Sequence, residues 1–173
     1  MKNLKRIYCM IGLPCSGKTT LVKKIIEKEP RIVVVSADTL RKTIFGRDFF
    51  EPGEEIVWAV RKYMLMSLMS WGNPIIIDET NLTKYRREKI INLAGQFDYE
   101  VYGLILDTPK EVCIERAYND NNTKIVPIIR EKSLTCPDKT EGFKDIKFIC
   151  KDTDIRDFIS VKDLNDRVRG RGR

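Results

Sequence analysis

The feature that most constrains the fold of this chain is a glycine-rich segment near its N-terminus. Residues 12–19 read Gly-Leu-Pro-Cys-Ser-Gly-Lys-Thr, which is a complete G-x-x-x-x-G-K-T motif. An apolar run at 6–11 precedes this motif, and an amphipathic stretch at 18–28 follows it. The motif requires this order of strand, phosphate-binding loop and helix. The sequence therefore predicts a loop that holds the β- and γ-phosphates of a nucleoside triphosphate.

Each residue type in the motif has a physical role. Successive backbone N–H groups form an anion nest, and the helix behind them adds a partial positive charge. The two glycines allow backbone conformations that a Cβ would obstruct. The lysine is expected to reach the phosphates and the threonine hydroxyl to bind Mg²⁺, so ATP and Mg²⁺ are the expected cofactors. The predicted nucleotide-binding residues are Gly12, Pro14, Cys15, Ser16, Gly17, Lys18, Thr19 and Thr20.

Short apolar runs alternate with helical patterns along the rest of the chain. Candidate strands are 6–11, 31–36, 74–78, 100–106 and 145–150, and candidate helices are 18–28, 39–45, 54–71, 83–94 and 109–118. Near-continuous β-branched runs are typical of strands buried on both faces of a parallel sheet. Repeated strand–helix units imply right-handed crossovers and a three-layer α/β sandwich with a parallel central sheet.

Length and composition set the expected organisation and compartment. The 173 residues have the size of one domain, so we expect a single domain over 1–173 that ends in a basic tail at 167–173. The sequence contains no run of ~18 apolar residues, so we expect no membrane-spanning helix, and its N-terminus lacks a signal-peptide pattern. The five cysteines, an odd number without C-x-x-C spacing, indicate reduced thiols in a cytoplasmic protein.

The absence of histidine narrows the possible chemistry. Without imidazole, Ser-His-Asp and Cys-His nucleophile systems and His-containing zinc sites are excluded. A general base must then be Asp or Glu, or less often Lys, Tyr or Cys. The net charge of +7 suits a nucleic-acid partner, although a moderately basic surface is also common among nucleotide-binding proteins. The basic tail is compatible with nucleic-acid contact or with a solvated chain end.

Asp38 and Arg41 follow the second predicted strand. Ligands of open α/β sheets bind at the carboxyl ends of strands, which is also where the phosphate-binding loop lies. Residues three apart share a helix face, so Asp38 is placed to accept a proton from an acceptor hydroxyl and Arg41 to hold an acceptor phosphate. The alternative interpretation is that Ser36 or Asp38 caps the helix.

The third predicted strand ends in the carboxylates Asp78 and Glu79. A carboxylate at this position typically contacts Mg²⁺ directly or through water, and we assign Asp78 to this role, with Glu79 as the alternative. A strand that ends in Asp-Glu also occurs in ATP-hydrolysing motors, where the glutamate polarises water. The short chain disfavours a motor, and no Asn-Lys-x-Asp motif indicates a GTPase.

The polar segment after Arg116 lies where small kinases place a lid. A lid supplies cations to the transferred phosphoryl group and excludes water. We place the lid at about 116–134, and its candidate cations are Arg116, Lys124 and Arg130.

The order of these motifs resembles that of phage-type polynucleotide 5′-kinases and their bacterial RNA-repair relatives, within the P-loop kinase family. After the loop come Asp38-x-x-Arg41, Thr80-Asn81-Leu82 with Arg86-Arg87, and Thr123-Lys124-x-Val126-Pro127. The segment 137–143 resembles the one that these kinases carry before their last strand. The resemblance covers about residues 4–150.

This resemblance implies a three-layer P-loop kinase fold with a parallel central sheet and a helical lid. It also implies ATP-dependent phosphorylation of the 5′-hydroxyl ends of DNA or RNA. Asp38 would be the general base, Arg41 would grip the 3′-phosphate of the acceptor, and a lid arginine would stabilise the transferred group. The chain has Asp120-Asn121 where that arginine falls in the phage enzyme, so Arg116 or Arg130 would act instead.

The acceptor remains open at this point. A kinase of a small-molecule hydroxyl would use the same donor loop, and so would an ATP-hydrolysing regulatory module. No Asp-x-Asp-x-Thr motif of the phage enzyme's phosphatase half is present.

Overall fold

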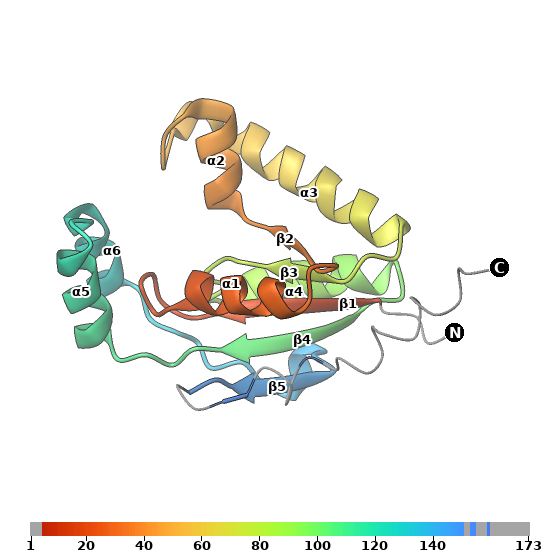
Figure 1. Cartoon of the computed structure of the whole chain (residues 1–173). Helices are drawn as coiled ribbons and strands as arrows, with labels where there is room; N and C mark the ends of the chain where they lie inside the picture. Colours follow the sequence, from red (N-terminus) through yellow and green to blue (C-terminus); the bar gives the residue numbers. More distant parts are fainter. Residues whose placement is uncertain (1–4, 151–152, 155–158, 160–173) are drawn as a thin grey trace.

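A computed structural model of the protein describes residues 5–150, 153–154 and 159 (Figure 1). The basic tail at 167–173 lies outside the described residues. The strands are β1 (Arg6–Ile11), β2 (Val33–Val35), β3 (Ile75–Ile77), β4 (Glu100–Ile105) and β5 (Asp145–Phe148). The helices are α1 (Lys18–Lys28), α2 (Ala37–Phe45), α3 (Glu54–Ser70), α4 (Lys84–Gly95), α5 (Lys110–Asn119) and α6 (Val126–Glu131). Three 3₁₀ turns are η1 (Glu51–Gly53), η2 (Thr123–Ile125) and η3 (Lys139–Glu141).

The strands form one five-stranded sheet in the order β2-β3-β1-β4-β5, and all neighbours are parallel. This arrangement confirms the predicted parallel α/β fold. The second strand is shorter than the predicted 31–36, because the Ile32 N–H donates to Glu29 O in the turn that closes α1. The fifth strand ends at Phe148, two residues before the predicted 150.

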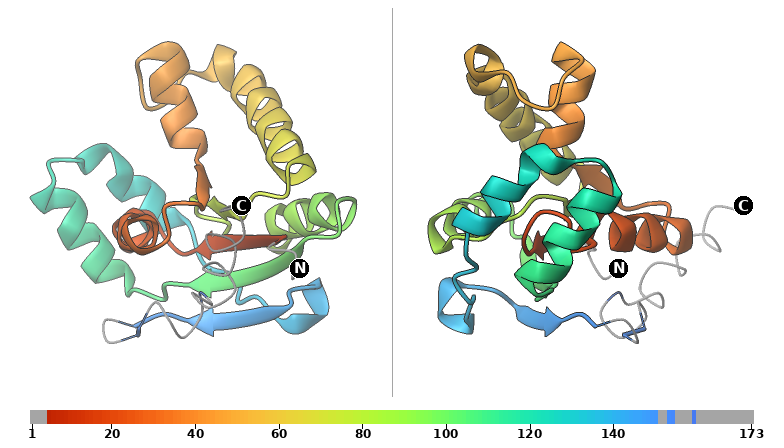
Figure 2. Two further views of the ribbon diagram at one scale, coloured as in Figure 1. Left: turned by 45° about the vertical axis from the view of Figure 1, so that its right-hand side comes forward. Right: turned by 90° about the vertical axis from the view of Figure 1, so that its left-hand side faces the viewer.

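The strand β1 shows why the sheet is covered on both faces. Its residues point alternately to two separate cores. Ile7, Cys9 and Ile11 pack with residues of α3 and α4, whereas Tyr8 and Met10 pack with residues of α1. Figure 2 shows the resulting layers, with α1 on one face of the sheet and α4 on the other.

Two helical pairs flank the sheet (Figure 1). The pair α2–α3 rises above it, with α2 following the carboxyl end of β2 and α3 returning to the start of β3. The pair α5–α6 lies beyond the carboxyl ends of β1 and β4, towards which their arrows point. The second pair has a small core of its own, which includes Leu13 of the glycine-rich loop, Cys113 of α5 and Ile129 of α6. This shared core fixes α5 and α6 against the loop. None of the helices in the described part of the chain has the length and apolar character that a membrane crossing requires.

A buried ion pair holds α4 against the segment before β5. The Arg87 side chain is fully buried and donates from Nε and Nη2 to the two carboxylate oxygens of Glu141, both at 2.7 Å. Its Nη1 donates to the main-chain oxygens of Asn81 and Leu82. Two segments that carried the family resemblance, 80–87 and 137–143, are therefore joined, and this contact stabilises the fold rather than facing a ligand.

Candidate active site

The glycine-rich loop between β1 and α1 is held by the ends of two neighbouring strands. The Gly12 N–H donates to Thr80 O at 3.0 Å, and Thr108 Oγ1 donates to Ser16 O at 3.0 Å. A Cβ on Gly12 would lie 2.7 Å from Leu106 O, so the loop passes too close to β4 for any side chain there. Gly17 has a φ of 103°, in the left-handed region, and caps the N-terminus of α1. The loop is therefore preshaped as an anion nest.

Lys18 lies inside this nest. Its side chain is buried, and Nζ donates to Gly12 O at 3.0 Å, to Leu13 O at 2.6 Å and to Ser16 Oγ at 3.3 Å. Burial lowers the pKa of Lys18 to about 8, and the nearby Asp78 carboxylate opposes this decrease. The ammonium is thus held where it can interact with phosphate oxygens that enter the nest.

The lowered pKa of Lys18 predicts proton uptake when ATP binds at alkaline pH. Because a basic group loses its proton as pH rises through its pKa, Lys18 is mostly neutral at pH 9 and mostly charged at pH 7. Phosphate charge favours the ammonium, so at pH 9 we expect an uptake approaching one proton per ATP, on the order of 0.9, and little at pH 7. Calorimetry in two buffers of different ionisation enthalpy measures this. No uptake at pH 9 would contradict the assigned environment.

Thr19 and Asp78, the two predicted metal ligands, meet in the structure. Thr19 Oγ1 donates to Asp78 Oδ2 at 2.8 Å. Burial raises the pKa of Asp78, and the bond from Thr19 opposes this increase. Mg²⁺ often binds to one or two protein oxygens and completes its shell with water and phosphate oxygens. A hydroxyl and a carboxylate beside a phosphate nest fit that ion, and among the described residues no cluster of three Asp, Glu, Cys or His side chains suggests a different metal site.

Glu79, the alternative metal ligand, is engaged elsewhere. Its two carboxylate oxygens accept hydrogen bonds from Arg61 Nε and Nη2 of α3, and its side chain is 8% exposed. Because neighbouring residues at a strand end point in opposite directions, Asp78 faces the loop while Glu79 faces α3. The structure thus places Asp78 beside Thr19, and Glu79 beside Arg61.

The different positions of Asp78 and Glu79 predict that substituting them changes the Mg²⁺ requirement to different extents. We expect Asp78→Asn to raise the Mg²⁺ concentration required for half-maximal activity about 10–100-fold, because it removes a charged oxygen beside Thr19. Glu79→Gln, an equal change one residue away, is expected to leave that concentration within a few-fold. A magnesium titration of phosphoryl transfer compares them. The opposite ranking would assign the ion to Glu79.

A cleft of about 1040 Å³ opens along the loop. Six of the predicted nucleotide-binding residues line it, from Cys15 to Thr20, whereas Gly12 and Pro14 shape the loop behind it. Arg116 of α5 also lines the cleft, and its Nη1 donates to Cys15 O at 3.2 Å. Lys124 and Arg130 are exposed and do not line it. Of the predicted lid cations, Arg116 is the one that the fold brings to the loop.

Asp38 and Arg41 lie together at the base of α2, as predicted. Ser36 Oγ caps this helix by accepting from the Thr39 N–H, so the helix begins at Ala37, two residues earlier than predicted. Asp38 is therefore not the cap, and its exposed side chain accepts from Arg41 Nη1 at 2.6 Å. Asp38 lies three residues after the end of β2, and β2 ends beside Asp78, whose N–H donates to Val35 O at 3.0 Å. Asp38 is therefore on the same edge of the sheet as the donor loop.

No sequence pattern indicates the third member of this group, Glu54 at the start of α3. Its two carboxylate oxygens accept from Arg41 Nε and Nη2, both at 2.7 Å, and these bonds lower the pKa of Glu54. The Arg41 guanidinium also lies 5.8 Å from the centre of the Trp58 ring. Arg41 is thus held by a carboxylate fork and an aromatic ring, and its remaining donor orients Asp38.

Comparisons with known proteins show both partial relatives and complete structural neighbours. The human NEDD4-binding protein 2 is 29% identical over 179 residues, which cover 89% of this chain and 10% of that protein. The Arabidopsis thaliana protein named transcription factor bHLH140 is 24% identical over 164 residues, which cover 90% and 17%. The chain therefore spans between 10% and 17% of the length of these two relatives.

Three solved structures have the same fold at low identity. A putative kinase from Chloroflexus aurantiacus has a TM-score of 0.66 at 15% identity and is matched over 98% of this chain and 96% of that one. A chain of the Pnkp1/Rnl/Hen1 complex has a TM-score of 0.60 at 20% identity, over 88% and 48%. A gluconokinase from Sinorhizobium meliloti has a TM-score of 0.56 at 16% identity, over 87% and 86%.

A protein family also matches the part of the chain that carries the loop and the strand ends. The family described as AAA domain matches residues 7–124, well over half of the 173 residues. A nucleotide and Mg²⁺ are general ligands of proteins with this loop. The chain therefore belongs to the AAA domain family, and its fold is that of a P-loop kinase.

Proposed function

We propose that this chain transfers the γ-phosphoryl group of ATP to the 5′-hydroxyl end of DNA or RNA. The observation that carries the proposal is the position of Asp38. It lies on the same edge of the sheet as the donor loop and Asp78, and Arg41 Nη1 donates to it at 2.6 Å. A carboxylate opposite a phosphate nest is the arrangement that proton removal from an acceptor hydroxyl requires in a chain without histidine.

On the donor side, the loop amides and Lys18 bind the β- and γ-phosphates of ATP. Thr19 and Asp78 hold Mg²⁺, which when bound neutralises charge on these phosphates. Arg116 lies on the same cleft and contributes a fixed positive charge to the transferred phosphoryl group.

On the acceptor side, the hydroxyl oxygen forms a bond to the γ-phosphorus while the bond from that phosphorus to the β,γ-bridging oxygen breaks. ADP leaves, and the hydroxyl proton passes to Asp38. Arg41 orients Asp38 in the structure, and it would grip an acceptor phosphate with the two donors that now hold Glu54.

A small-molecule kinase is the second candidate function. The gluconokinase is matched over 86% of its length, whereas the chain of the Pnkp1/Rnl/Hen1 complex is matched over 48%. The basic net charge and the Asp38-x-x-Arg41 pair favour the polynucleotide end.

The deciding experiment offers γ-labelled ATP with several acceptors. These are 5′-hydroxyl DNA and RNA oligonucleotides, nucleosides with and without a 3′-phosphate, and a panel of small alcohols that includes gluconate. We expect label at oligonucleotide ends. Transfer to a small alcohol alone would support the second function, and rapid ATP hydrolysis without any transfer, abolished in Glu79→Gln, would support a regulatory ATPase.

Arg116 and Arg130 form a matched pair for testing the lid cation. We expect Arg116→Ala to lower kcat for phosphoryl transfer at least about 10²-fold, because it removes a cation that lines the donor cleft. Arg130→Ala removes the same charge from an exposed position and is expected to change kcat less than about threefold. Single-turnover label transfer measures both. Equal losses, or a greater loss in Arg130→Ala, would reverse the assignment.

A further inference from the structure

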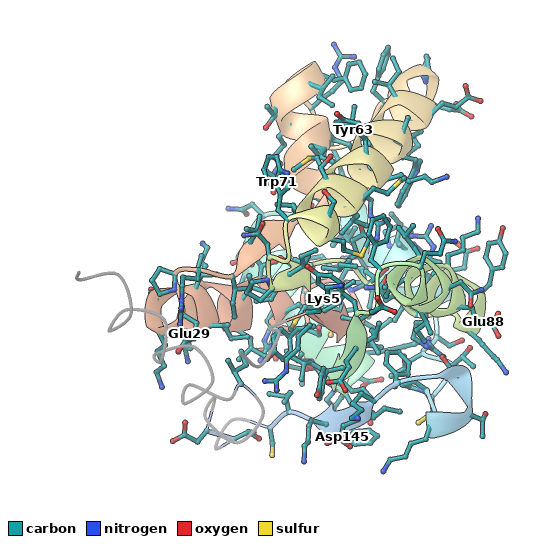
Figure 3. All side chains as sticks on the ribbon, turned by 90° about the vertical axis from the view of Figure 1, so that its right-hand side faces the viewer. Lys5, Glu29, Tyr63, Trp71, Glu88 and Asp145 are labelled. Atoms are coloured by element: carbon teal, nitrogen blue, oxygen red, sulfur yellow. The ribbon has the colours of Figure 1, made fainter. Side chains whose placement is uncertain are left out.

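A second cavity, of about 620 Å³, lies between α3 and α4 on the opposite face of the sheet from α1. Its interior is apolar and includes Leu65 and Met69 of α3, Ile90 of α4, and Ile7 and Ile77 of the sheet. Figure 3 views this side of the molecule, where α3, which carries Tyr63, rises above α4, which carries Glu88. We call this cavity the α3–α4 groove. None of the roles assigned to the donor cleft uses it.

The rim of the groove combines basic and aromatic side chains. Trp58, Arg61 and Lys62 come from α3, and Tyr85, Arg86 and Lys89 come from α4. The guanidinium groups of Arg61 and Arg86 lie 5.4 and 5.5 Å from the centre of the Trp58 ring, and Lys89 Nζ lies 4.3 Å from that of Tyr85. Glu79 is the single carboxylate among the lining residues, and it pairs with Arg61. The rim therefore carries excess positive charge beside the exposed ring of Tyr85.

The groove is continuous with the acceptor side of the active site. Arg41 donates to Asp38 at 2.6 Å and stacks near Trp58 at 5.8 Å, and Trp58 lines the groove. An acceptor whose hydroxyl reaches Asp38 has its next units beside Trp58. Its remaining units then have a path between the two helices.

A buried polar atom in the groove also lacks a partner. Asn81 lines the groove and is 1% exposed. Its Nδ2 donates to Met10 O at 2.8 Å, which fixes the orientation of the amide, but its Oδ1 accepts no hydrogen bond from the described residues. A buried acceptor without a donor is unfavourable, so a ligand that brings an N–H group into the groove would satisfy it.

We infer that the α3–α4 groove binds the nucleotides that follow the 5′ end of a single-stranded polynucleotide acceptor, an inference that rests on the proposed function. Tyr85, which is exposed, stacks on a base, Lys62, Arg86 and Lys89 bind phosphates, and Asn81 Oδ1 accepts from a base amino group. Basic grooves with aromatic faces bind single strands because unpaired bases offer their π-faces. A duplex keeps its bases stacked inside and offers neither the faces nor the amino groups.

The first test measures binding of the full chain to a fluorescent ten-nucleotide single strand with a 5′-hydroxyl, by anisotropy. In the double variant Lys62→Ala/Lys89→Ala we expect affinity to fall about 10-fold at low salt and the salt dependence of binding to decrease. The matched control Lys23→Ala/Lys132→Ala removes two exposed lysines outside the groove. Its affinity for the single strand is expected to fall less than threefold. In Tyr85→Ala, a change at an exposed position, the affinity is expected to fall about 5–100-fold because a base loses its stacking partner.

The second test separates failure of the groove from failure of the proposed function. In the same groove variants we expect the KM for the ten-nucleotide acceptor to rise about 10-fold, with the KM values for ATP and for a 3′-phosphorylated nucleoside unchanged. If wild type labels oligonucleotide ends but the groove variants behave like the control pair, the inference is wrong and the proposed function stands. If wild type labels no end yet its single-strand binding depends on Lys62 and Lys89, the groove assignment survives without the kinase assignment. Equal or tighter binding of a blunt duplex would overturn the single-strand specificity.

Discussion

Asp38→Asn is expected to abolish most phosphoryl transfer while ATP binds almost normally. The substitution keeps the size of the side chain and an oxygen that can accept from Arg41 Nη1, but it removes the basicity that takes the acceptor proton. Loss of a general base lowers the rate by about 10²–10⁴-fold. Single-turnover transfer from γ-labelled ATP measures the chemical step, and calorimetry measures the affinity for ATP.

The neighbouring cap offers a control for Asp38. Ser36→Ala removes the hydroxyl that accepts from Thr39 N–H, which costs about 1 kcal/mol of stability, and it leaves the carboxylate at 38 in place. We expect this variant to retain transfer within a few-fold. If Asp38→Asn also retained transfer within a few-fold, the assignment of Asp38 as the base would be wrong. Another residue would then have to accept the proton of the acceptor hydroxyl.

Of the single substitutions proposed for this protein, Arg87→Met is expected to lower the free energy of unfolding most. The side chain and its partner Glu141 are 0% and 1% exposed, so removal of the arginine leaves a carboxylate buried without its counter-ion. Breaking one partner of a buried pair lowers the free energy of unfolding by about 3–5 kcal/mol. The main-chain oxygens of Asn81 and Leu82 also lose their donor. Urea denaturation, followed by far-UV circular dichroism, measures the change.

Two further variants show whether the effect comes from the unpaired charge. Arg87→Met/Glu141→Leu replaces both partners by apolar side chains and is expected to recover much of the lost stability. Lys144→Met breaks the exposed pair between Lys144 and Glu100 and is expected to change the free energy of unfolding by less than about 1 kcal/mol. A loss in Arg87→Met no larger than that in Lys144→Met would show that the buried pair contributes little.

The donor side of the site could be predicted from the sequence because short, contiguous motifs define it. The spacing of Gly12, Gly17, Lys18 and Thr19 defines the loop, and the buried strand before Asp78 defines the edge at which the carboxylate appears. Parallel strands deliver their carboxyl ends to one edge, so the predicted meeting of Thr19 and Asp78 follows from topology. The five-strand parallel sheet was predictable for the same reason, since each strand carries its own apolar run.

The acceptor side and the packing of α3 and α4 depend on ion pairs that no periodicity encodes. Arg41 pairs with Glu54, Arg61 with Glu79, and Arg87 with Glu141, and these partners are 13, 18 and 54 residues apart. A hydrophobic pattern indicates which face of an element is buried, but it does not indicate which charge on another element completes a pair. Nor does it indicate that the Asp78 side chain contacts Thr19 while that of Glu79 contacts Arg61.

The Arg41–Glu54 ion pair makes acceptor recognition a competition. A phosphate that takes both Nε and Nη2 of Arg41 must first release the Glu54 carboxylate, so one charge-assisted pair is exchanged for another. The affinity gained from an acceptor phosphate is then the difference between two similar terms, and its sign depends on how well the released carboxylate is hydrated. Because Glu54 belongs to α3 and Arg41 to α2, this exchange also breaks an ion pair that joins the two helices. An acceptor without a phosphate leaves that ion pair intact.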